Sequence, residues 1–129
     1  SILQFESPVV FGDGEQTRDF TYIDNVVQMN LNALSTTNHE AFGEIFNVAC
    51  GSRISINQLF FTIRDLLSKH DASINKVEAT YIGERPGDIR HSLADISKSQ
   101  SHLNYIPKYN CQQGLEEAMN WYWDSLRGD

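Results

Sequence analysis

Short strand-like segments alternate with helix-like segments along the whole of this 129-residue chain, and this alternation constrains its fold more than any other feature. The segments expected to form strands are residues 8–11, 18–23, 44–49 and 76–82. The segments expected to form helices are residues 24–34, 55–67, 97–103 and 111–126. This order predicts an α/β fold, and no domain boundary is visible inside the chain.

Three of these segments carry more detailed expectations. The stretch Glu44–Ala49 is apolar almost throughout, which is typical of a strand buried on both faces of a parallel sheet. Ser55 and Gln58 fit a capping box, in which both side chains bond to backbone N–H groups at the start of a helix. Asp24 is expected to be the N-cap of the helix at residues 24–34. The apolar residues of that helix should pack one face on a core, and they are Val26, Val27, Met29, Leu31 and Leu34.

The charge balance and the cysteine content exclude several classes of partner and site. Ten Lys and Arg against 17 Asp and Glu give a net charge of −7, which argues against nucleic acid because such a partner requires a basic face. No apolar run approaches the roughly 20 residues of a membrane span, and no signal peptide is visible. We therefore expect no membrane partner and a cytoplasmic protein. Cys50 and Cys111 are expected to be reduced thiols, and the spacing of His and Cys predicts no metal site.

Two loops concentrate charged residues around glycine, and each follows a predicted strand, where ligand loops of α/β sheets gather. Arg18 in the first loop and Arg85 in the second each offer a planar donor fork that suits phosphate oxygens. Asp88 could accept hydrogen bonds from the vicinal hydroxyls of a ribose. Together these residues would form a clamp for a nucleoside diphosphate. The two loops are residues 12–20 and 83–92.

The chain carries no recognisable catalytic set. Gly12 and Gly14 do not continue into a G-x-G-x-x-G dinucleotide fingerprint, because residue 17 is Thr. No tyrosine is followed by a lysine four residues later, and no Ser-His-Asp arrangement, nucleophile elbow or P-loop is present. The residues by themselves therefore indicate binding loops without a catalytic centre.

Three ordered stretches resemble the C-terminal third of extended short-chain dehydrogenase/reductase enzymes. The resemblance is strongest to NAD-dependent UDP-sugar 4-epimerases, in particular bacterial UDP-N-acetylglucosamine 4-epimerases, and it covers nearly the whole chain. It implies the α/β, C-terminal, substrate-binding part of such an enzyme. The helix from Asp24 and the strand Ile45–Ala49 would belong to the Rossmann domain. The three stretches are residues 8–27, 45–49 and 85–95.

The resemblance also implies roles for individual residues. Arg18 and Arg85 match the two arginines that bind the pyrophosphate, and Asp88 matches the carboxylate at the ribose. Ser92 falls where family members line the sugar pocket. A small residue there leaves room for a 2-N-acetyl group, which favours UDP-GlcNAc and UDP-GalNAc over UDP-Glc and UDP-Gal. The segment whose backbone faces the uracil is matched by Val9, Val10 and Phe11.

The family reaction, as the resemblance implies, moves a hydride from C4 of the sugar to NAD and back to the other face, with a Tyr-x-x-x-Lys pair handling the proton. That pair and the glycine-rich NAD loop are absent here, and the chain opens at Ser1 rather than Met. We therefore expect residues 1–129 to be a C-terminal nucleotide-sugar-binding fragment without catalytic or cofactor-binding residues. The NAD would be held by a missing N-terminal Rossmann region, and the isolated chain should be inactive. The full-length protein is expected to be a homodimer, and the fragment to expose apolar faces.

Three other interpretations stay open. The parent could be a nucleotide-sugar dehydratase or decarboxylase of the same family, because similar loops recur across it. The chain could be a stand-alone nucleotide-binding module. It could also be a structural α/β domain whose arginines pair with neighbouring acids, such as Arg18 with Asp19 and Arg85 with Glu84.

Overall fold

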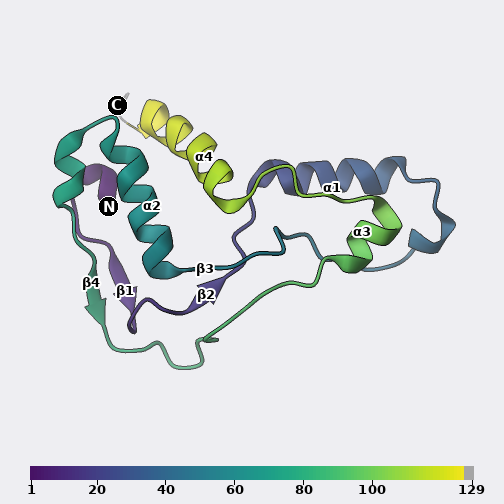
Figure 1. Ribbon diagram of the computed structural model, residues 1–129, viewed down its shortest axis with the longest axis horizontal. Helices are drawn as coiled ribbons and strands as arrows, with labels where there is room; N and C mark the ends of the chain where they lie inside the picture. The colour runs from purple at the N-terminus through teal and green to yellow at the C-terminus, as the bar shows by residue number, and fades with distance from the viewer. Residues whose placement is uncertain (127–129) are drawn as a thin grey trace. The chain divides into compact units, whose positions relative to one another are not determined.

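The computed structural model describes residues 1–126, and the mixture of helices and strands expected from the sequence is confirmed (Figure 1). The helices are α1 (Ile23–Ser35), α2 (Ile56–Ser68), α3 (Ser97–Leu103) and α4 (Cys111–Leu126). The strands are β1 (Val9–Phe11), β2 (Thr17–Arg18), β3 (Ile54–Ser55) and β4 (Thr80–Ile82). Short 3₁₀ helices are η1 (Ile2–Gln4), η2 (His39–Ala41) and η3 (Ala72–Lys76).

The chain divides into two compact units, although its sequence shows no boundary. The first unit comprises Ser1–Arg18, Ile54–His91 and the chain from Leu115 onward. The second comprises Asp19–Arg53 and Ser92–Gly114. Each unit is assembled from segments that are far apart in the sequence, so no linker composition marks the division.

Two pairs of short strands organise the first unit (Figure 1). β1 and β4 are parallel, with Val9 opposite Thr80, and β2 and β3 are antiparallel, with Thr17 opposite Ser55. The register brings the turn after β1 to the loop after β4, because the Gly12 N–H donates to the Ile82 carbonyl at 2.9 Å. The core of this unit lies on α2, η3 and α4, and its buried members are Leu66, Leu67, Ile74 and Met119.

The predicted capping box at the start of α2 is confirmed. The Gln58 N–H donates to the Ser55 Oγ at 3.1 Å, and the Ser55 N–H donates to the Gln58 Oε1 at 2.9 Å. Two of the backbone N–H groups at the helix start are thereby satisfied. The same serine ends β3, so the capping box fixes where the strand turns into the helix.

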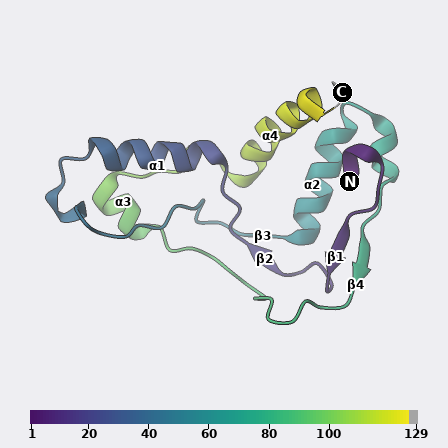
Figure 2. The same ribbon diagram turned by 180° about the vertical axis from the view of Figure 1, so that it is seen from behind.

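The second unit packs α1 beside α3 around its own core (Figure 2). Asn25 on α1 is fully buried, and its side chain bridges to the segment before α4. Its Nδ2 donates to the Tyr109 carbonyl at 2.8 Å, and its Oδ1 accepts from the N–H groups of Lys108 and Tyr109 at 2.9 and 3.0 Å. The buried apolar members of this core are Met29, Ala41, Ala49, Ile96, Leu103 and Tyr105.

The segment Glu44–Ala49 is not a strand, so that expectation is wrong for this chain. Within residues 1–126 no strand pairs with it, and a strand exists only where a neighbour satisfies its backbone groups. Ile45 is 86% exposed, whereas Ala49 is buried in the core of the second unit. The segment therefore has the apolar composition of a buried strand, but within residues 1–126 it lacks the neighbouring strand that would give it a strand conformation.

The expected start of α1 and the expected burial of its apolar face are also wrong. The N-cap is Tyr22, two residues before the expected Asp24, and it makes no side-chain cap hydrogen bond; Asp24 lies in the first turn instead. Of the expected strand at residues 18–23, only Arg18 lies in a strand, β2. Of the predicted apolar face only Met29 is buried. The exposed apolar residues of α1 follow one another at helical spacing, and they are Ile23, Val27, Leu31 and Leu34.

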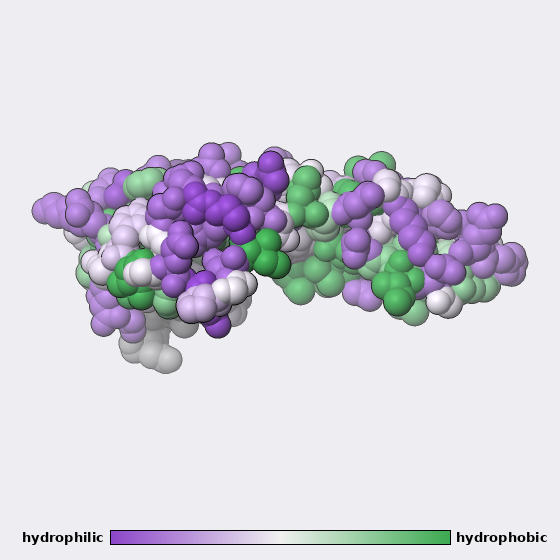
Figure 3. All heavy atoms as spheres, turned by 90° about the horizontal axis from the view of Figure 1, so that it is seen from below, coloured by the Kyte–Doolittle hydropathy of each residue, from purple (hydrophilic) through white to green (hydrophobic). Residues whose placement is uncertain are grey.

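Exposed hydrophobic side chains lie among hydrophilic ones elsewhere on the surface as well (Figure 3). None of the helices in the described part of the chain combines the length and the apolar character that a membrane span requires.

Candidate functional site

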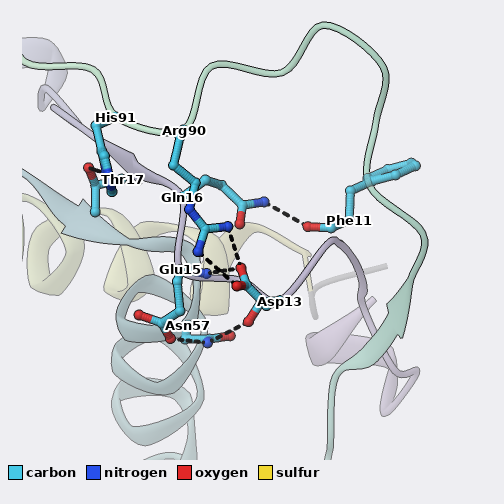
Figure 4. Close-up of polar contacts among 8 residues, drawn as sticks. All are labelled: Phe11, Asp13, Glu15, Gln16, Thr17, Asn57, Arg90 and His91. Carbon is cyan, nitrogen blue, oxygen red and sulfur yellow. Dashed lines mark hydrogen bonds and ion pairs between the residues drawn. The ribbon is translucent and has the colours of Figure 1, made fainter.

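The two charged loops meet in the first unit, where backbone hydrogen bonds join them (Figure 4). The Thr17 N–H donates to the Arg90 carbonyl at 2.9 Å, and Thr17 pairs with His91 as an isolated parallel bridge. The Thr17 Oγ1 also lies 3.0 Å from the His91 Nδ1. Hydrogen bonds therefore hold the loop after β4 against the start of β2.

A bidentate ion pair strengthens this junction. Both terminal nitrogens of Arg90 donate to the carboxylate of Asp13, each at 2.8 Å. This contact, together with a hydrogen bond from the Glu15 N–H, lowers the pKa of Asp13 from 3.8 to about 2. The same contact raises the pKa of Arg90. Neither residue has a role that the sequence predicts, because nothing in the local pattern pairs residues 77 positions apart.

Asn57 at the start of α2 holds the turn after β1 from the other side (Figure 4). Its Nδ2 donates to the Asp13 carbonyl at 3.0 Å and to the Glu15 Oε1 at 2.6 Å, and its Oδ1 accepts from the Tyr81 hydroxyl at 2.8 Å. Gly14 makes this approach possible: it has a φ of +75°, and a Cβ there would lie 2.0 Å from the Asn57 Oδ1. Asn57 is thus a further site residue that the sequence analysis missed.

The structure brings two members of the predicted clamp into direct contact. The Arg18 guanidinium forms an ion pair with the Asp88 carboxylate, across the two loops. The Arg85 guanidinium makes no ion pair within residues 1–126. The alternative pairing of each arginine with its neighbouring acid is not observed there. Asp19 instead accepts hydrogen bonds from the N–H groups of Cys50 and Gly51.

A hollow of about 140 Å³ lies between the loops. It is smaller than the roughly 300–1,000 Å³ of a complete small-molecule pocket, so it suits one part of a larger ligand. Three predicted site residues line it, namely Phe11, Arg85 and Asp88. The lining residues that the sequence analysis did not single out are Gly12, Gln16, Glu84 and Arg90.

The backbone of β1 presents alternate residues to its free edge. The Pro8 carbonyl accepts from the Thr80 N–H, and the Gly12 N–H donates to Ile82, so these groups face β4. Because successive residues of a strand alternate, the backbone groups of Val10 also face β4, and its side chain is only 5% exposed. The backbone groups of Val9 and Phe11 lie on the free edge.

Ser92, the predicted sugar-pocket residue, is exposed and begins the return segment of the second unit. The other six predicted site residues lie in the first unit.

The chain offers no counterpart of a dinucleotide cradle or a metal centre in its described residues. The turn through Gly12 and Gly14 leads into β2 rather than into a helix, so it lacks the helix N-terminus that binds a pyrophosphate. Residues 1–126 contain no group of three or more His, Cys, Asp or Glu side chains that could hold a metal ion. Burial raises the pKa of the Cys50 and Cys111 thiols, which makes both poor nucleophiles.

Comparison with known proteins places these loops in a family. The family model described as GDP-mannose 4,6 dehydratase matches residues 2–118. A putative UDP-glucose 4-epimerase of Methanocaldococcus jannaschii is 37% identical over 93% of this chain and 35% of its own length. The structure of UDP-N-acetylglucosamine 4-epimerase from Methanobrevibacter ruminantium, in complex with UDP-N-acetylmuramic acid, is 36% identical with a TM-score of 0.80, over 95% of this chain and 36% of that one. The structure of UDP-glucuronic acid 4-epimerase from Bacillus cereus, in complex with UDP-glucuronic acid and NAD, is 32% identical with a TM-score of 0.78, over 95% and 37%.

Other relatives catalyse different reactions. They include a dTDP-glucose 4,6-dehydratase of Xanthomonas campestris, 28% identical over 88% of this chain and 32% of the relative. A UDP-N-acetyl-alpha-D-glucosaminuronate decarboxylase of Bacillus cytotoxicus is 26% identical over 93% and 36%. The chain spans about a third of the length of the curated relatives that it matches.

Proposed function

The chain belongs to this family of extended short-chain dehydrogenases/reductases, and on that premise we propose that it is the nucleotide-sugar-binding part of a UDP-sugar 4-epimerase. The observation that carries the proposal is the contact between Arg18 and Asp88, which are 70 positions apart in the sequence, beside the hollow that Arg85 lines. Guanidinium forks suit diphosphate oxygens in bidentate fashion. The solved relatives in complex with UDP-sugars support the same ligand class.

In this proposal each residue of the junction has one task. Arg18 and Arg85 bind the diphosphate, and Asp88 binds the ribose hydroxyls. The free edge of β1, at Val9 and Phe11, faces the uracil, with Val10 packed beneath it. Holding the diphosphate uses binding energy that is remote from the reacting carbon to position the sugar.

The reaction itself we assign to a part of the protein outside this chain. The relative from Bacillus cereus was solved with NAD, and the present residues do not fit a dinucleotide. In the proposed arrangement an N-terminal Rossmann region holds NAD and the catalytic pair, and it covers the exposed apolar face of α1 together with Ile45. Residues 1–129 alone should therefore have no epimerase activity. Turnover of a UDP-sugar by the isolated chain would contradict this.

The binding role is tested by removing both arginines from the full-length protein. Charge-assisted hydrogen bonds contribute about 1.5–3 kcal/mol each, so Arg18→Ala with Arg85→Ala should weaken UDP-sugar binding at least 100-fold in calorimetry. The melting temperature should change little, because Arg85 is exposed and the partly exposed ion pair of Arg18 with Asp88 contributes little to stability. Arg53→Ala is the matched control, since this exposed arginine lies in the second unit and makes no ion pair within residues 1–126. An unchanged dissociation constant in the double variant would refute the proposal.

For the sugar we propose UDP-GlcNAc and UDP-GalNAc, on the basis of the small side chain of Ser92. The full-length protein should interconvert this pair, and Ser92→Tyr should shift the preference toward UDP-Glc and UDP-Gal. Exclusive turnover of the unacetylated pair by the unaltered protein would exclude this assignment.

A dehydratase or decarboxylase is the second candidate, because both activities occur among the relatives. Product analysis separates the three reactions: an epimer keeps the mass of the substrate, whereas the other reactions release water or carbon dioxide. We further propose that the full-length protein is a cytoplasmic homodimer, which light scattering and cell fractionation would test.

A further inference from the structure

Gln16 carries an acceptor that nothing in the described chain satisfies. The residue is only 8% exposed, and it lines the hollow between the loops. Its Nε2 donates to the Phe11 carbonyl at 2.7 Å, whereas its buried Oε1 has no hydrogen-bond partner (Figure 4). Buried polar atoms without a partner are rare and unfavourable in folded proteins. An orphan acceptor inside a ligand hollow therefore points to a donor on the ligand.

The Phe11 carbonyl determines which way the amide of Gln16 faces. Rotating the amide by 180° would set Oε1 against the carbonyl oxygen, where neither atom can donate. The side chain is thus held with its acceptor, and not its NH₂ group, left without a partner in the described chain. This excludes a direct role on the diphosphate, whose oxygens are acceptors.

The donor groups of a uridine diphosphate, the ligand of the proposed function, are few. The ribose offers two hydroxyls, which suit the carboxylate of Asp88, and a uracil or thymine base offers the imide N3–H. That N–H lies between two carbonyl oxygens. The Phe11 N–H, on the same free edge of β1 as the carbonyl that Gln16 binds, is a suitable donor for one of these oxygens. Gln16 Oε1 and the Phe11 N–H therefore supply the two kinds of group, an acceptor and a donor, that the edge of a pyrimidine-2,4-dione requires.

We propose that Gln16 is the base-selecting residue of this site: its Oε1 accepts a hydrogen bond from the N3–H of a uracil or thymine base. A cytosine ring presents an acceptor at N3, and the amide cannot rotate to match it. The site should therefore discriminate against cytidine nucleotides. The assignment rests on the proposed function, in which the strand backbone lies against the uracil, and it makes this side chain the group that distinguishes a protonated N3 from an unprotonated one.

The experiment measures the binding of UDP, CDP, N3-methyl-UDP and 2′-deoxy-UDP to the full-length protein by calorimetry, without turnover. A single hydrogen bond contributes roughly a factor of ten, so CDP and N3-methyl-UDP should each bind the unaltered protein about tenfold more weakly than UDP. In Gln16→Ala the preference for UDP over CDP should fall to within about twofold, while the loss caused by 2′-deoxy-UDP stays the same.

Gln28→Ala is the matched control. Gln28 has the same arrangement, with its Nε2 donating to the Ile106 carbonyl at 3.0 Å and an unpartnered Oε1, but it lies in the second unit. It should leave the preference for UDP unchanged. The nucleotide series on the unaltered protein provides a test that does not depend on whether a Gln16 variant folds.

Each outcome decides the proposal. Equal binding of UDP and CDP by the unaltered protein would overturn it, as would a UDP preference that persists in a folded Gln16→Ala. A loss of the 2′-deoxy effect in that variant would assign Gln16 to the ribose instead, and would also overturn it. Failure of the unaltered protein to bind UDP at all would refute the proposed function rather than the role of Gln16.

Discussion

Substituting alanine for Gly14 should disrupt the loop junction more than the same change at Gly12, although both glycines have positive φ values of +75° and +71°. An L residue in this region costs roughly 1–2 kcal/mol. At Gly12 the added Cβ would meet only Glu84 Cγ at 3.4 Å, which is an ordinary contact. At Gly14 it would lie 2.0 Å from the Asn57 Oδ1 and 2.5 Å from its Cγ. The difference between the variants therefore isolates the steric clash from the backbone strain.

The clash is costly because Asn57 is not free to move. Its side chain makes hydrogen bonds to Asp13, Glu15 and Tyr81. Each contributes about 0.5–1.5 kcal/mol, and solvent exposure places these bonds in the lower part of that range. Displacing the side chain should therefore cost about 2 kcal/mol beyond the strain, so Gly14→Ala should destabilise the protein by roughly 3–4 kcal/mol and Gly12→Ala by only 1–2 kcal/mol.

The assay is urea unfolding of the two variants, followed by circular dichroism, with UDP binding measured in parallel. A third variant, Gly43→Ala, reports the strain alone, since its φ is +76° and nothing lies within 4 Å of the added Cβ. On an Asn57→Ala background the cost of Gly14→Ala should shrink to that of Gly43→Ala, because the obstacle is gone. If the losses of unfolding free energy in Gly14→Ala and Gly12→Ala differ by less than about 0.5 kcal/mol, the Asn57 side chain moves aside at little cost and the reasoning is wrong.

Three further predictions concern the capping box, the buried amide and the ion pair. Ser55→Ala should lower the free energy of unfolding by about 1 kcal/mol, because the α2 cap is lost; no change in urea unfolding would contradict this. Asn25→Leu should cost roughly 3–5 kcal/mol, because two backbone N–H groups and the Tyr109 carbonyl lose their partner in a buried site; a loss below 1 kcal/mol would mean that water replaces the amide. Asp13 should stay ionised down to about pH 2, so its contribution to the loop junction is complete above 3.8 and declines as the pH falls from there toward 2. NMR titration should show Arg90→Ala returning this pKa toward 3.8, and an unshifted titration would argue against the ion pair.

Local features of the fold were predictable from the sequence because neighbouring residues create them. The capping box at Ser55 needs only four consecutive residues, and α4 has the predicted bounds Cys111–Leu126. The two charged loops were recognised from their composition and from the strands that precede them. Their motifs were also sufficient to identify the family, which the comparisons confirm.

Features that depend on a distant partner were not predictable in the same way. Glu44–Ala49 has the composition of a buried strand, yet no strand pairs with it within residues 1–126. The apolar stripe of α1 predicts burial, but only the environment of the helix decides which face is covered. Composition gives a segment a preference for a conformation or for burial, and strand pairing or packing determines whether the segment adopts it.

The sequence by itself determined the start of α2, the bounds of α4, the charged loops and the arginines that suit a diphosphate, because these follow from side-chain chemistry and short-range hydrogen bonds. Only the tertiary structure decided that Arg18 pairs with Asp88, that Asn57 braces the turn at Gly14, and that Gln16 lines the hollow while its amide oxygen has no partner within residues 1–126. These contacts join segments that the chain brings together by strand pairing. No local pattern specifies which distant donor meets which acceptor, so the candidate base-reading residue becomes visible only in the folded protein.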